Sequence, residues 1–360
     1  MTTNKEIVLE GPKRSCIGPE DISKKRILLT GAAGFVGHHF VEGILKETDW
    51  EIVILDGLTY AGDPNRLTNI SCWEQEKHRV NFVWWDLRSE LNYSIEKEIG
   101  EVDFVVHMAA ESHVDRSISD AKPFIMSNIL GTYHLLEYIR KRPVKKFIYF
   151  STDEVFGPIT EGGWKEDSRH APGNPYSATK AAAEDLCLAY ANTYKLPIII
   201  TNTMNVFGER QHPEKYIPLV ISKVLKGEQV TIHSNPDRTK AGTRFYIHAR
   251  NALKAILFIL NNTNEFLDVK DPMKGRFNIV GEKEIDNLAL AQIIAEVVGK
   301  ELKYEMVDFH SSRPGHDLRY GLDGSKLKEM GFNYPSTFED TLNKTITWFL
   351  KQENSKWLKD

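Results

Sequence analysis

Residues 26–37 read RILLTGAAGFVG, an apolar run followed by a glycine-rich turn. The run predicts a buried parallel strand over Arg26–Thr30, and the amphipathic segment after the turn predicts a helix. In this context Gly31 permits a tight turn, Gly34 lets the backbone approach a pyrophosphate, and Gly37 lets the helix pack on the strand. The stretch therefore predicts a dinucleotide-binding turn at a helix N-terminus.

A carboxylate after the next predicted strand, Glu51–Leu55, indicates which dinucleotide binds. Asp56 follows that strand directly. A carboxylate at this position accepts hydrogen bonds from a ribose diol and repels a 2′-phosphate, so the sequence predicts NAD rather than NADP. Asp86 and Leu87 end a third predicted strand, Val80–Trp85, where the adenine would lie; a solvated strand end is the alternative for Asp86.

Further apolar runs alternate with helical segments along the chain. Strands are predicted over Asp103–Met108, Lys146–Phe150 and Pro197–Thr201, and helices over Pro123–Arg140 and Tyr176–Tyr194. This alternation predicts an α/β fold with a doubly wound parallel sheet.

The regular alternation begins near Arg26 and ends near Asn205. These two boundaries divide the chain into three parts. Residues 1–25 are polar and form an N-terminal extension to which the sequence assigns no role. Residues 26–205 are predicted to form the Rossmann domain that binds NAD. Residues 206–360 are predicted to form mainly a smaller substrate-binding lobe, with segments that return to the Rossmann domain.

Composition and charge exclude several classes of protein. The net charge of −4 and the dispersed basic residues exclude a general nucleic-acid-binding surface. Cys16, Cys72 and Cys187 form no metal-ligand pattern, so no metal is predicted, and reduced thiols suit a cytoplasmic protein. No apolar run reaches membrane-spanning length, and the first residues do not read as a signal peptide.

Tyr176 and Lys180 lie four residues apart in NPYSATK (residues 174–180), within a predicted helix. Residues at this spacing share one helix face. An ammonium beside a phenol and a nicotinamide ring lowers the phenol pKa, so the tyrosine can act as a base at neutral pH. Such pairs also occur on ordinary helix surfaces. Here the pair follows a dinucleotide motif and precedes another strand, which favours the catalytic interpretation.

Two adjacent carboxylates, Asp153 and Glu154, follow the strand that is predicted to end at Phe150. Ligands of parallel sheets bind at the carboxyl ends of the strands. If the surroundings of the two groups separate their pKa values, one can serve as general acid and the other as general base. A solvated loop start is the alternative, and the pair in isolation favours it.

With these elements the chain resembles the extended short-chain dehydrogenase/reductases, and among them the dTDP-glucose 4,6-dehydratases. The resemblance runs from about Arg26 into the C-terminal region. The stretches that carry it, in the family's order, are LTYAG (residues 58–62), HMAAESHVDRS (107–117), STDEV (151–155), PEKYIP (213–218) and RPGHD (313–317).

The resemblance and the motifs together assign roles to individual positions. The residues expected to bind NAD are Gly31, Gly34, Phe35, Val36, Gly37, Asp56, Thr59, Asp86, Leu87, Ala109, Ala110, Ser112, Ser127, Tyr176 and Lys180. Those expected to bind the substrate are Ser112, Thr152, Asn205, Lys215, Tyr216, Arg244, Asn278, Arg313 and His316. Those expected to be catalytic are Thr152, Asp153, Glu154, Tyr176 and Lys180.

The reaction that the resemblance implies dehydrates a nucleoside-diphosphate hexose, with dTDP-glucose or UDP-glucose as the expected substrate. Tyr176 removes the 4-hydroxyl proton as the C4 hydride moves to NAD, Glu154 removes the C5 proton, and Asp153 protonates the departing 6-hydroxyl. The hydride then returns to C6 and leaves a 4-keto-6-deoxy sugar. NADH must stay bound between the two transfers.

The chain departs from the family's pattern mainly on the substrate side. Phe156 stands where a tyrosine is usual, and Val206 where a second asparagine is frequent. The segment Asp237–Tyr246 differs in length and arginine placement, so either Arg244 or Arg238 could hold a diphosphate there. These differences leave the nucleotide base and the sugar open.

Two other functions fit parts of this pattern. A nucleotide-sugar 4-epimerase would use the same NAD site and the Tyr176–Lys180 pair, but it needs no Asp153–Glu154 pair. A non-catalytic NAD-binding scaffold would be expected to lack at least one of these four groups, whereas all of them are present.

The resemblance also implies a homodimer held by a four-helix bundle. The helices that would form it are those predicted near Pro123–Arg140 and at Tyr176–Tyr194. A buried face would explain the apolar residues Ile129, Leu130, Leu135 and Leu136 of the first helix, and a monomer core explains several of them equally well.

Overall fold

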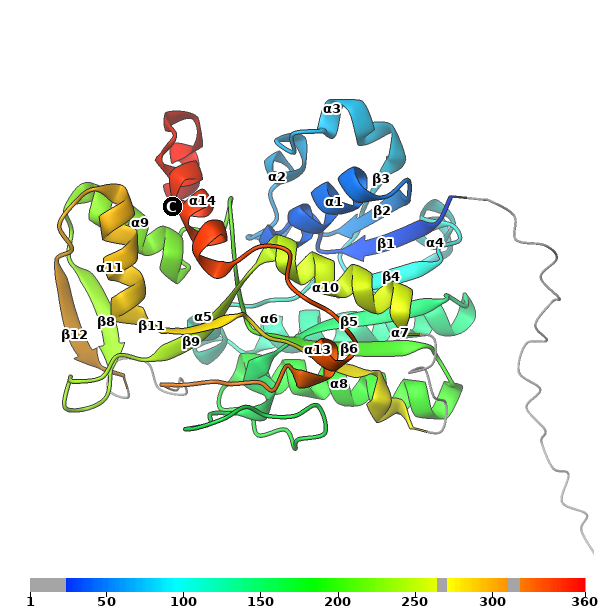
Figure 1. Cartoon of the computed structure of the whole chain (residues 1–360). Coiled ribbons are helices and arrows are strands. Elements are labelled where there is room, and N and C mark those ends of the chain that lie inside the picture. The colour runs from blue at the N-terminus through cyan, green and yellow to red at the C-terminus, as the bar shows by residue number, and fades with distance from the viewer. Residues whose placement is uncertain (1–23, 264–270, 310–317, 360) are drawn as a thin grey trace, which may run out of the picture.

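The computed structural model describes residues 24–263, 271–309 and 318–359, which form a larger α/β unit and a smaller lobe beside it (Figure 1). The predicted extension, residues 1–25, lies outside the described residues except for its last two positions.

The α/β unit is built on a seven-stranded sheet in which every neighbouring pair is parallel. Its strands are β1 (Arg26–Thr30), β2 (Glu51–Asp56), β3 (Val80–Trp84), β4 (Phe104–His107), β5 (Lys146–Thr152), β6 (Ile198–Thr203) and β10 (Arg276–Ile279). They lie in the order β10-β6-β5-β4-β1-β2-β3. The doubly wound parallel fold predicted from the sequence is confirmed.

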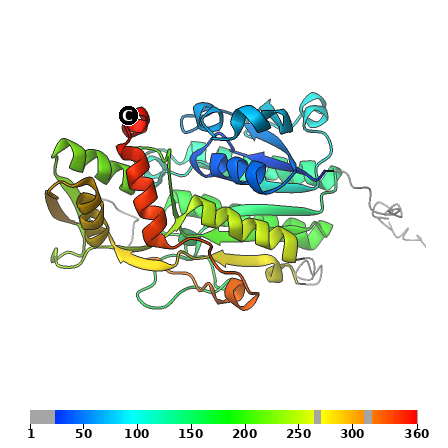
Figure 2. The ribbon, with the colours of Figure 1, turned by 45° about the horizontal axis from the view of Figure 1, so that its top comes forward.

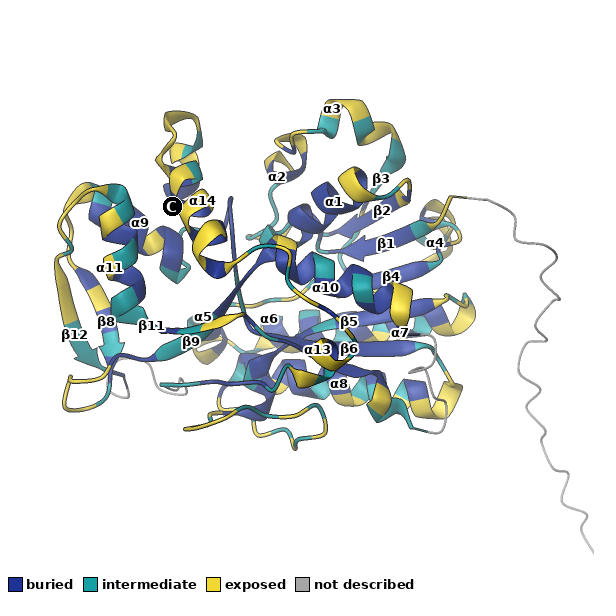
Figure 3. Ribbon diagram, in the orientation of Figure 1, coloured by how far each residue is buried: buried dark blue, intermediate teal, exposed yellow. Residues whose placement is uncertain are grey.

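Both faces of the sheet are covered, which explains why its strands read as continuous apolar runs. In β1, Ile27 and Leu29 point to one face and Leu28 to the other, and all are fully buried. Figure 3 shows the same burial along the neighbouring strands.

Two helices cover the face that carries Ile27 and Leu29. They are α1 (Phe35–Glu47) and α10 (Ala249–Asn262), which pack against each other and lie side by side in Figure 2. The opposite face is covered by α4 (Tyr93–Ile99), α7 (Gly131–Lys141) and α8 (Pro175–Tyr194). The chain crosses back to the sheet in α10 and β10, well beyond residue 205.

The single helix predicted over Pro123–Arg140 is divided in three. Its parts are α6 (Lys122–Phe124), a π-helical turn η2 (Ile125–Leu130), and α7. The sequence predicted one regular helix here and did not predict the π-helical turn. Such turns occur often at functional sites.

The smaller lobe combines short strands and helices around its own core. Its strands are β7 (Asn205–Phe207), β9 (Thr243–His248) and β11 (Lys283–Asp286) in one sheet, and β8 (Val230–Ser234) and β12 (Tyr304–Asp308) in another. Its helices are α9 (Tyr216–Lys226), α11 (Asn287–Val298) and α14 (Phe338–Leu350). The remaining short helices are α2 (Asn65–Thr68), α3 (Trp73–Glu76), η1 (Lys77–Arg79), α5 (Val114–Ser119), η3 (Asp153–Phe156), η5 (Pro272–Gly275), α13 (Ser325–Glu329) and η6 (Gln352–Leu358).

Candidate active site

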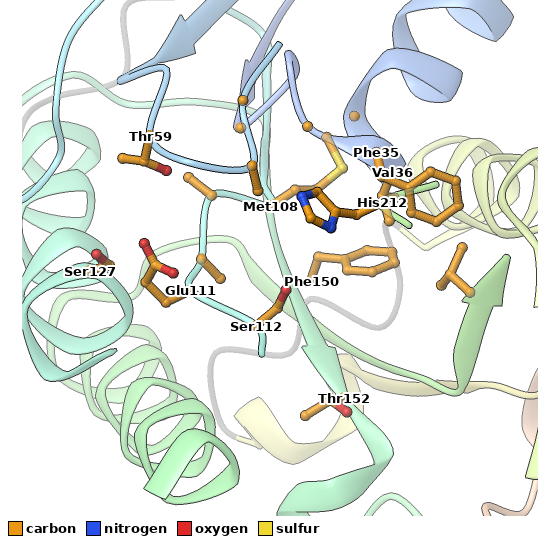
Figure 4. A pocket seen from close by; sticks show the side chains of 18 of the residues that line it. Phe35, Val36, Thr59, Met108, Glu111, Ser112, Ser127, Phe150, Thr152 and His212 are labelled. Atoms are coloured by element: carbon orange, nitrogen blue, oxygen red, sulfur yellow. The ribbon is translucent and has the colours of Figure 1, made fainter. Parts of the chain in front are cut away.

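A pocket opens at the carboxyl ends of the parallel strands, between the sheet and the smaller lobe (Figure 4). The predicted NAD-binding residues that line it are Gly31, Gly34, Phe35, Val36, Gly37, Asp56, Thr59, Asp86, Leu87, Ala109, Ala110, Ser112, Ser127, Tyr176 and Lys180. The other predicted residues that line it are Thr152, Asp153, Glu154, Asn205, Lys215 and Tyr216.

The glycine-rich turn has room for a dinucleotide because it lacks side chains. Gly31 has a φ of +70°, and a Cβ there would lie 2.8 Å from the Ala109 Cα. A Cβ at Gly37 would lie 2.4 Å from the Ala32 Cα. The helix α1 begins at Phe35, after the N-cap residue Gly34, and has no side-chain cap, so the N-terminus of the helix lies uncapped at the pocket. These features fit the pyrophosphate of NAD.

Asp56 ends β2 inside the pocket wall. Its Oδ2 accepts a hydrogen bond from the Ala33 amide at 2.8 Å, and its Oδ1 accepts one from the Leu58 amide at 2.8 Å. Burial raises the pKa of Asp56, and these amides oppose that effect. A carboxylate has about four acceptor positions, so about two remain for a ribose diol.

We expect the protein to bind NAD at least about tenfold more tightly than NADP, because a 2′-phosphate would meet the buried Asp56 carboxylate. The Asp56→Asn variant should reduce the ratio between the affinities for NAD and NADP, because it removes the negative charge while keeping one acceptor oxygen. Titration calorimetry with both dinucleotides measures it. Equal affinities in the unmodified protein would contradict the assignment of Asp56.

The segment that follows β3 and the π-helical turn η2 also line this part of the pocket. The Asp86 carboxylate pairs with Arg88, and this pair lowers the pKa of Asp86. Ser127 lies in the π-helical turn, and its neighbour Asn128 holds both backbone groups of Glu111. Figure 4 shows Ser127 and Glu111 on the same side of the pocket.

Tyr176 and Lys180 come from the first turns of α8, which begins with a capping box on Asn174. The buried Lys180 Nζ donates to the Phe150 carbonyl oxygen at 2.9 Å and lies 4.2 Å from the centre of the Tyr149 ring. Burial lowers the pKa of Lys180 to about 8. The predicted pair therefore lies together in the pocket, against the end of β5.

The sequence predicts that Lys180, together with the nicotinamide ring, lowers the pKa of Tyr176, and this stays a prediction. In the protein alone, burial and the negative charge of Glu154 raise that pKa, and a hydrogen bond with Thr152 opposes them. The Lys180 ammonium is held by the Phe150 carbonyl oxygen.

Asp153 and Glu154 occupy different environments although they are adjacent. The buried Asp153 accepts a hydrogen bond from the Thr152 hydroxyl at 3.0 Å through Oδ1, and its Oδ2 has no hydrogen-bond partner among the described residues. Burial, followed by the charge of Glu154, raises the pKa of Asp153 to about 7. Glu154 is only partly buried, and its Oε2 accepts a hydrogen bond from Asn174 Nδ2 at 3.1 Å. This asymmetry suits one acid and one base.

Two predicted substrate residues lie outside the pocket lining. Asn278 is buried in β10, where its side-chain amide donates to the carbonyl oxygens of Trp164 and Asp323 at 2.9 and 3.0 Å. Arg244 donates to the Leu318 carbonyl oxygen at 2.8 Å. These backbone acceptors hold both side chains in the structure. Two further predicted residues, Arg313 and His316, lie outside the described residues.

The positions that depart from the family's pattern lie in different places. Phe156 is fully buried behind the site, where its ring packs against Arg276, and Arg276 pairs with Glu184 at 2.7 Å. Val206 lines the pocket beside Asn205. Phe156 therefore belongs to the buried wall behind the site, whereas Val206 forms part of the pocket surface.

Sequence reasoning missed several pocket residues, which come from segments after β2, β3, β4 and β7. They include Tyr60, Arg66, Arg88, Glu111, His212 and Glu214. Tyr60, Glu111 and Glu214 stand inside the stretches LTYAG, HMAAESHVDRS and PEKYIP, which was the available signal. Arg66 had no such signal.

The helices predicted to form a dimer bundle bury part of their apolar face within the chain. Leu135 and Leu136 are fully buried in the core beneath α7, so a partner is not needed to explain them. Ile129 and Leu130 are only partly buried. Among the described residues, no helix is long and apolar enough to cross a membrane, and no cluster of His, Cys, Asp and Glu suits a metal ion.

Comparisons with known proteins agree with this geometry. The model of the NAD dependent epimerase/dehydratase family matches residues 27–279. A low-salt glycan biosynthesis protein of Haloferax volcanii is 38% identical over 325 residues, covering 90% of this chain and 98% of that relative. A dTDP-glucose 4,6-dehydratase of Streptomyces niveus is 36% identical over 342 residues, covering 92% and 94%.

A solved structure is similar over nearly the whole fold. It is a dTDP-glucose 4,6-dehydratase from Streptomyces venezuelae with NAD bound, which has a TM-score of 0.80 at 35% identity and covers 92% of this chain and 98% of that one. The glycine-rich turn, Asp56 and the Tyr176–Lys180 pair lie in one pocket here. The chain therefore belongs to the NAD-dependent epimerase/dehydratase family of nucleotide-sugar enzymes, and NAD is its cofactor.

Proposed function

We propose that the chain catalyses the 4,6-dehydration of a nucleoside-diphosphate hexose, with dTDP-glucose or UDP-glucose as substrate. The observation that carries this proposal is the Asp153–Glu154 pair, which lines the same pocket as Tyr176 and Lys180. The similarity to dTDP-glucose 4,6-dehydratases at 35–36% identity supports it.

The residues of the pocket divide the proposed reaction between them. When bound, NAD would supply the acceptor for the C4 hydride and the donor that returns it to C6, and the glycine-rich turn and Asp56 would hold it. Tyr176 removes the proton of the sugar 4-hydroxyl, with Lys180 beside it and Thr152 hydrogen-bonded to the phenol. A 4-keto group then acidifies the C5 proton.

The elimination step is assigned to the two carboxyl groups. Glu154 removes the C5 proton, and Asn174 holds it in place for this. Asp153 has a pKa near 7, so a large fraction carries a proton at neutral pH and can protonate the departing 6-hydroxyl. Epimerisation at C4 requires neither transfer, so a pair of this kind favours dehydration.

The diphosphate end of the substrate is assigned to the pocket side nearest the smaller lobe. Asn205, Lys215 and Tyr216 line that side, and Lys215 Nζ donates to the Ser112 carbonyl oxygen at 3.4 Å. Arg244 is close enough to Asp153 to lower its pKa slightly. Arg244 is a further candidate to bind the diphosphate. To reach it, the side chain would have to leave the carbonyl oxygens of Thr243 and Leu318.

Assembly as a homodimer remains part of the proposal. The apolar side chains that η2, α7 and α8 expose are Ile125, Tyr133 and Tyr194, which are 49%, 40% and 47% exposed. These residues, rather than Leu135 and Leu136, would form the contact with a second copy.

The proposed acid predicts a pH dependence. Asp153 must be protonated to act, so the rate of product formation should fall as the pH rises through about 7. The Asp153→Asn variant should lose this dependence along with most of its activity. Steady-state kcat against pH, with bound NADH followed in the same samples, measures it; a kcat that rises through this range and then stays level would contradict the role of Asp153.

A direct assay tests the function itself. NAD-loaded protein is mixed with dTDP-glucose or UDP-glucose, and the product is examined for a 4-keto group and for loss of the 6-hydroxyl. A 4-keto-6-deoxy sugar is the expected product. A C4-inverted sugar would identify an epimerase, and no reaction with a range of nucleotide sugars would favour a non-catalytic role.

A further inference from the structure

Two chain segments that are far apart in the sequence meet across the dinucleotide part of the pocket. One is the loop at residues 57–62, after β2, and the other is residues 208–216, which run from the end of β7 to the first residue of α9. Both line the pocket, and Figure 4 shows Thr59 and His212 bordering it. A bound dinucleotide would therefore lie against residues of both segments.

Arg66 connects these segments from the inner side. It is 3% exposed, and its guanidinium donates to the carbonyl oxygens of Ala61 at 2.6 Å, Ala33 at 3.3 Å and Arg210 at 3.1 Å. These carbonyls belong to the 57–62 loop, the glycine-rich turn and the 208–216 segment. One planar group with several fixed donors thus holds three parts of the pocket wall in register.

Glu214 connects the same segments nearer the surface. Its carboxylate lies 3.4 Å from His113 Nε2 and 3.8 Å from Arg116 Nη2, and it accepts a hydrogen bond from Tyr60. The Arg116 guanidinium lies 3.8 Å from the centre of the Tyr60 ring. Within the 208–216 segment, the His212 Nδ1 lies 3.6 Å from the Glu214 Oε1. Glu214 therefore joins the 57–62 loop and α5 to its own segment.

The proposed reaction gives such a connection a purpose. The hydride leaves C4 and returns to C6 of the same sugar, so no outside oxidant or reductant takes part. If NADH left between the two transfers, the sugar would stay unreduced at C6 and the protein would hold no cofactor for the next turnover. Slow release of NADH is therefore required.

We propose that Arg66 and Glu214 are positioning residues that clasp the 57–62 loop to the 208–216 segment and so retain the dinucleotide between the two hydride transfers. The requirement to retain NADH between the two transfers to the sugar rests on the proposed function. An epimerase in the same pocket would also have to keep its NADH, so the clasp can be tested separately from the dehydration.

The charge of Glu214 gives this proposal a test with a definite sign. NAD and NADH carry negative phosphates, so removal of a nearby negative charge should by electrostatics alone slow their release. If Glu214 instead holds the clasp together, the Glu214→Gln variant should release the dinucleotide faster. The two explanations predict opposite changes.

The experiment measures NADH dissociation from the full-length protein without any sugar. The protein is loaded with NADH, an excess of NAD is added, and the loss of bound-NADH fluorescence is followed. We expect Glu214→Gln to speed dissociation by about tenfold, with little change in association, because interface changes act mostly on dissociation. Tyr60→Phe should act in the same direction but less, since it removes only the phenolic hydroxyl.

Glu228→Gln is the matched control, because it removes the same charge from an exposed residue outside the pocket. Its dissociation rate should equal that of the unmodified protein. Thermal unfolding of each variant shows whether it is folded, and Arg66→Lys supplies a second variant that keeps the buried charge while losing the three-way hydrogen bonding. It should also release NADH faster.

A double variant completes the test. If Tyr60 and Glu214 act together, the combined effect of Tyr60→Phe and Glu214→Gln should be smaller than the product of the separate effects. Unchanged or slower NADH dissociation in folded Glu214→Gln protein would overturn the proposal. Because no sugar is present, that outcome is distinct from a failure of the proposed dehydration.

Discussion

Replacing Tyr176 with phenylalanine is expected to lower kcat by about 10²–10⁴-fold, the usual loss when a positioned general base is removed. NAD should still bind, because the glycine-rich turn and Asp56 are untouched. Single-turnover absorbance of the nicotinamide measures the first oxidation, and it should show almost no NADH in the variant.

Tyr190→Phe is a matched control on the same helix. Its phenol donates to Glu137 at 2.7 Å, and it does not line the pocket, so this variant should keep near-normal turnover. Near-normal turnover of folded Tyr176→Phe protein would show that another group takes the 4-hydroxyl proton.

The Glu154→Gln variant should stop the reaction at the elimination step, which follows the C4 oxidation that Tyr176→Phe blocks. It keeps the shape of the side chain but removes the proposed base, so oxidation at C4 should proceed while elimination slows by about 10²–10⁴-fold. Enzyme-bound NADH should then accumulate in proportion to active sites. Rapid mixing with nicotinamide detection, followed by analysis of the quenched sugar, measures both steps.

Glu161→Gln is the control for this variant, because Glu161 is an exposed carboxylate on the following loop. It should neither accumulate NADH nor slow product release. A Glu154→Gln enzyme that turns over normally without accumulating NADH would remove Glu154 from the mechanism.

Much of the fold was predictable because the strands are buried on both faces. Continuous apolar runs such as Arg26–Thr30 give strand positions to within a residue or two, and Asp56 marks a strand end. The strand predicted over Lys146–Phe150 extends to Thr152, since Ser151 and Thr152 pair with β6 although they are polar. Because these two residues are polar, the apolar run alone does not predict that the strand includes them.

The features that were missed depend on contacts between distant segments. Nothing near Arg66 in the sequence shows that its guanidinium meets Arg210, and no periodicity shows that Ser127 lies in a π-helical turn. The position of Asn278 depends on the return of β10 to the main sheet, where it pairs beside Asn202. The sequence predicts that segments beyond residue 205 return to the Rossmann domain, but local pattern does not show which ones.

The most direct test of the central claim is the structure of the sugar product formed in heavy water, determined by NMR and mass. The proposed dehydration predicts a 4-keto-6-deoxy sugar with solvent deuterium at C5, and with a hydrogen at C6 that came from C4 of the substrate. A sugar inverted at C4, with its 6-hydroxyl intact and no deuterium at C5, would contradict the dehydratase assignment and identify an epimerase.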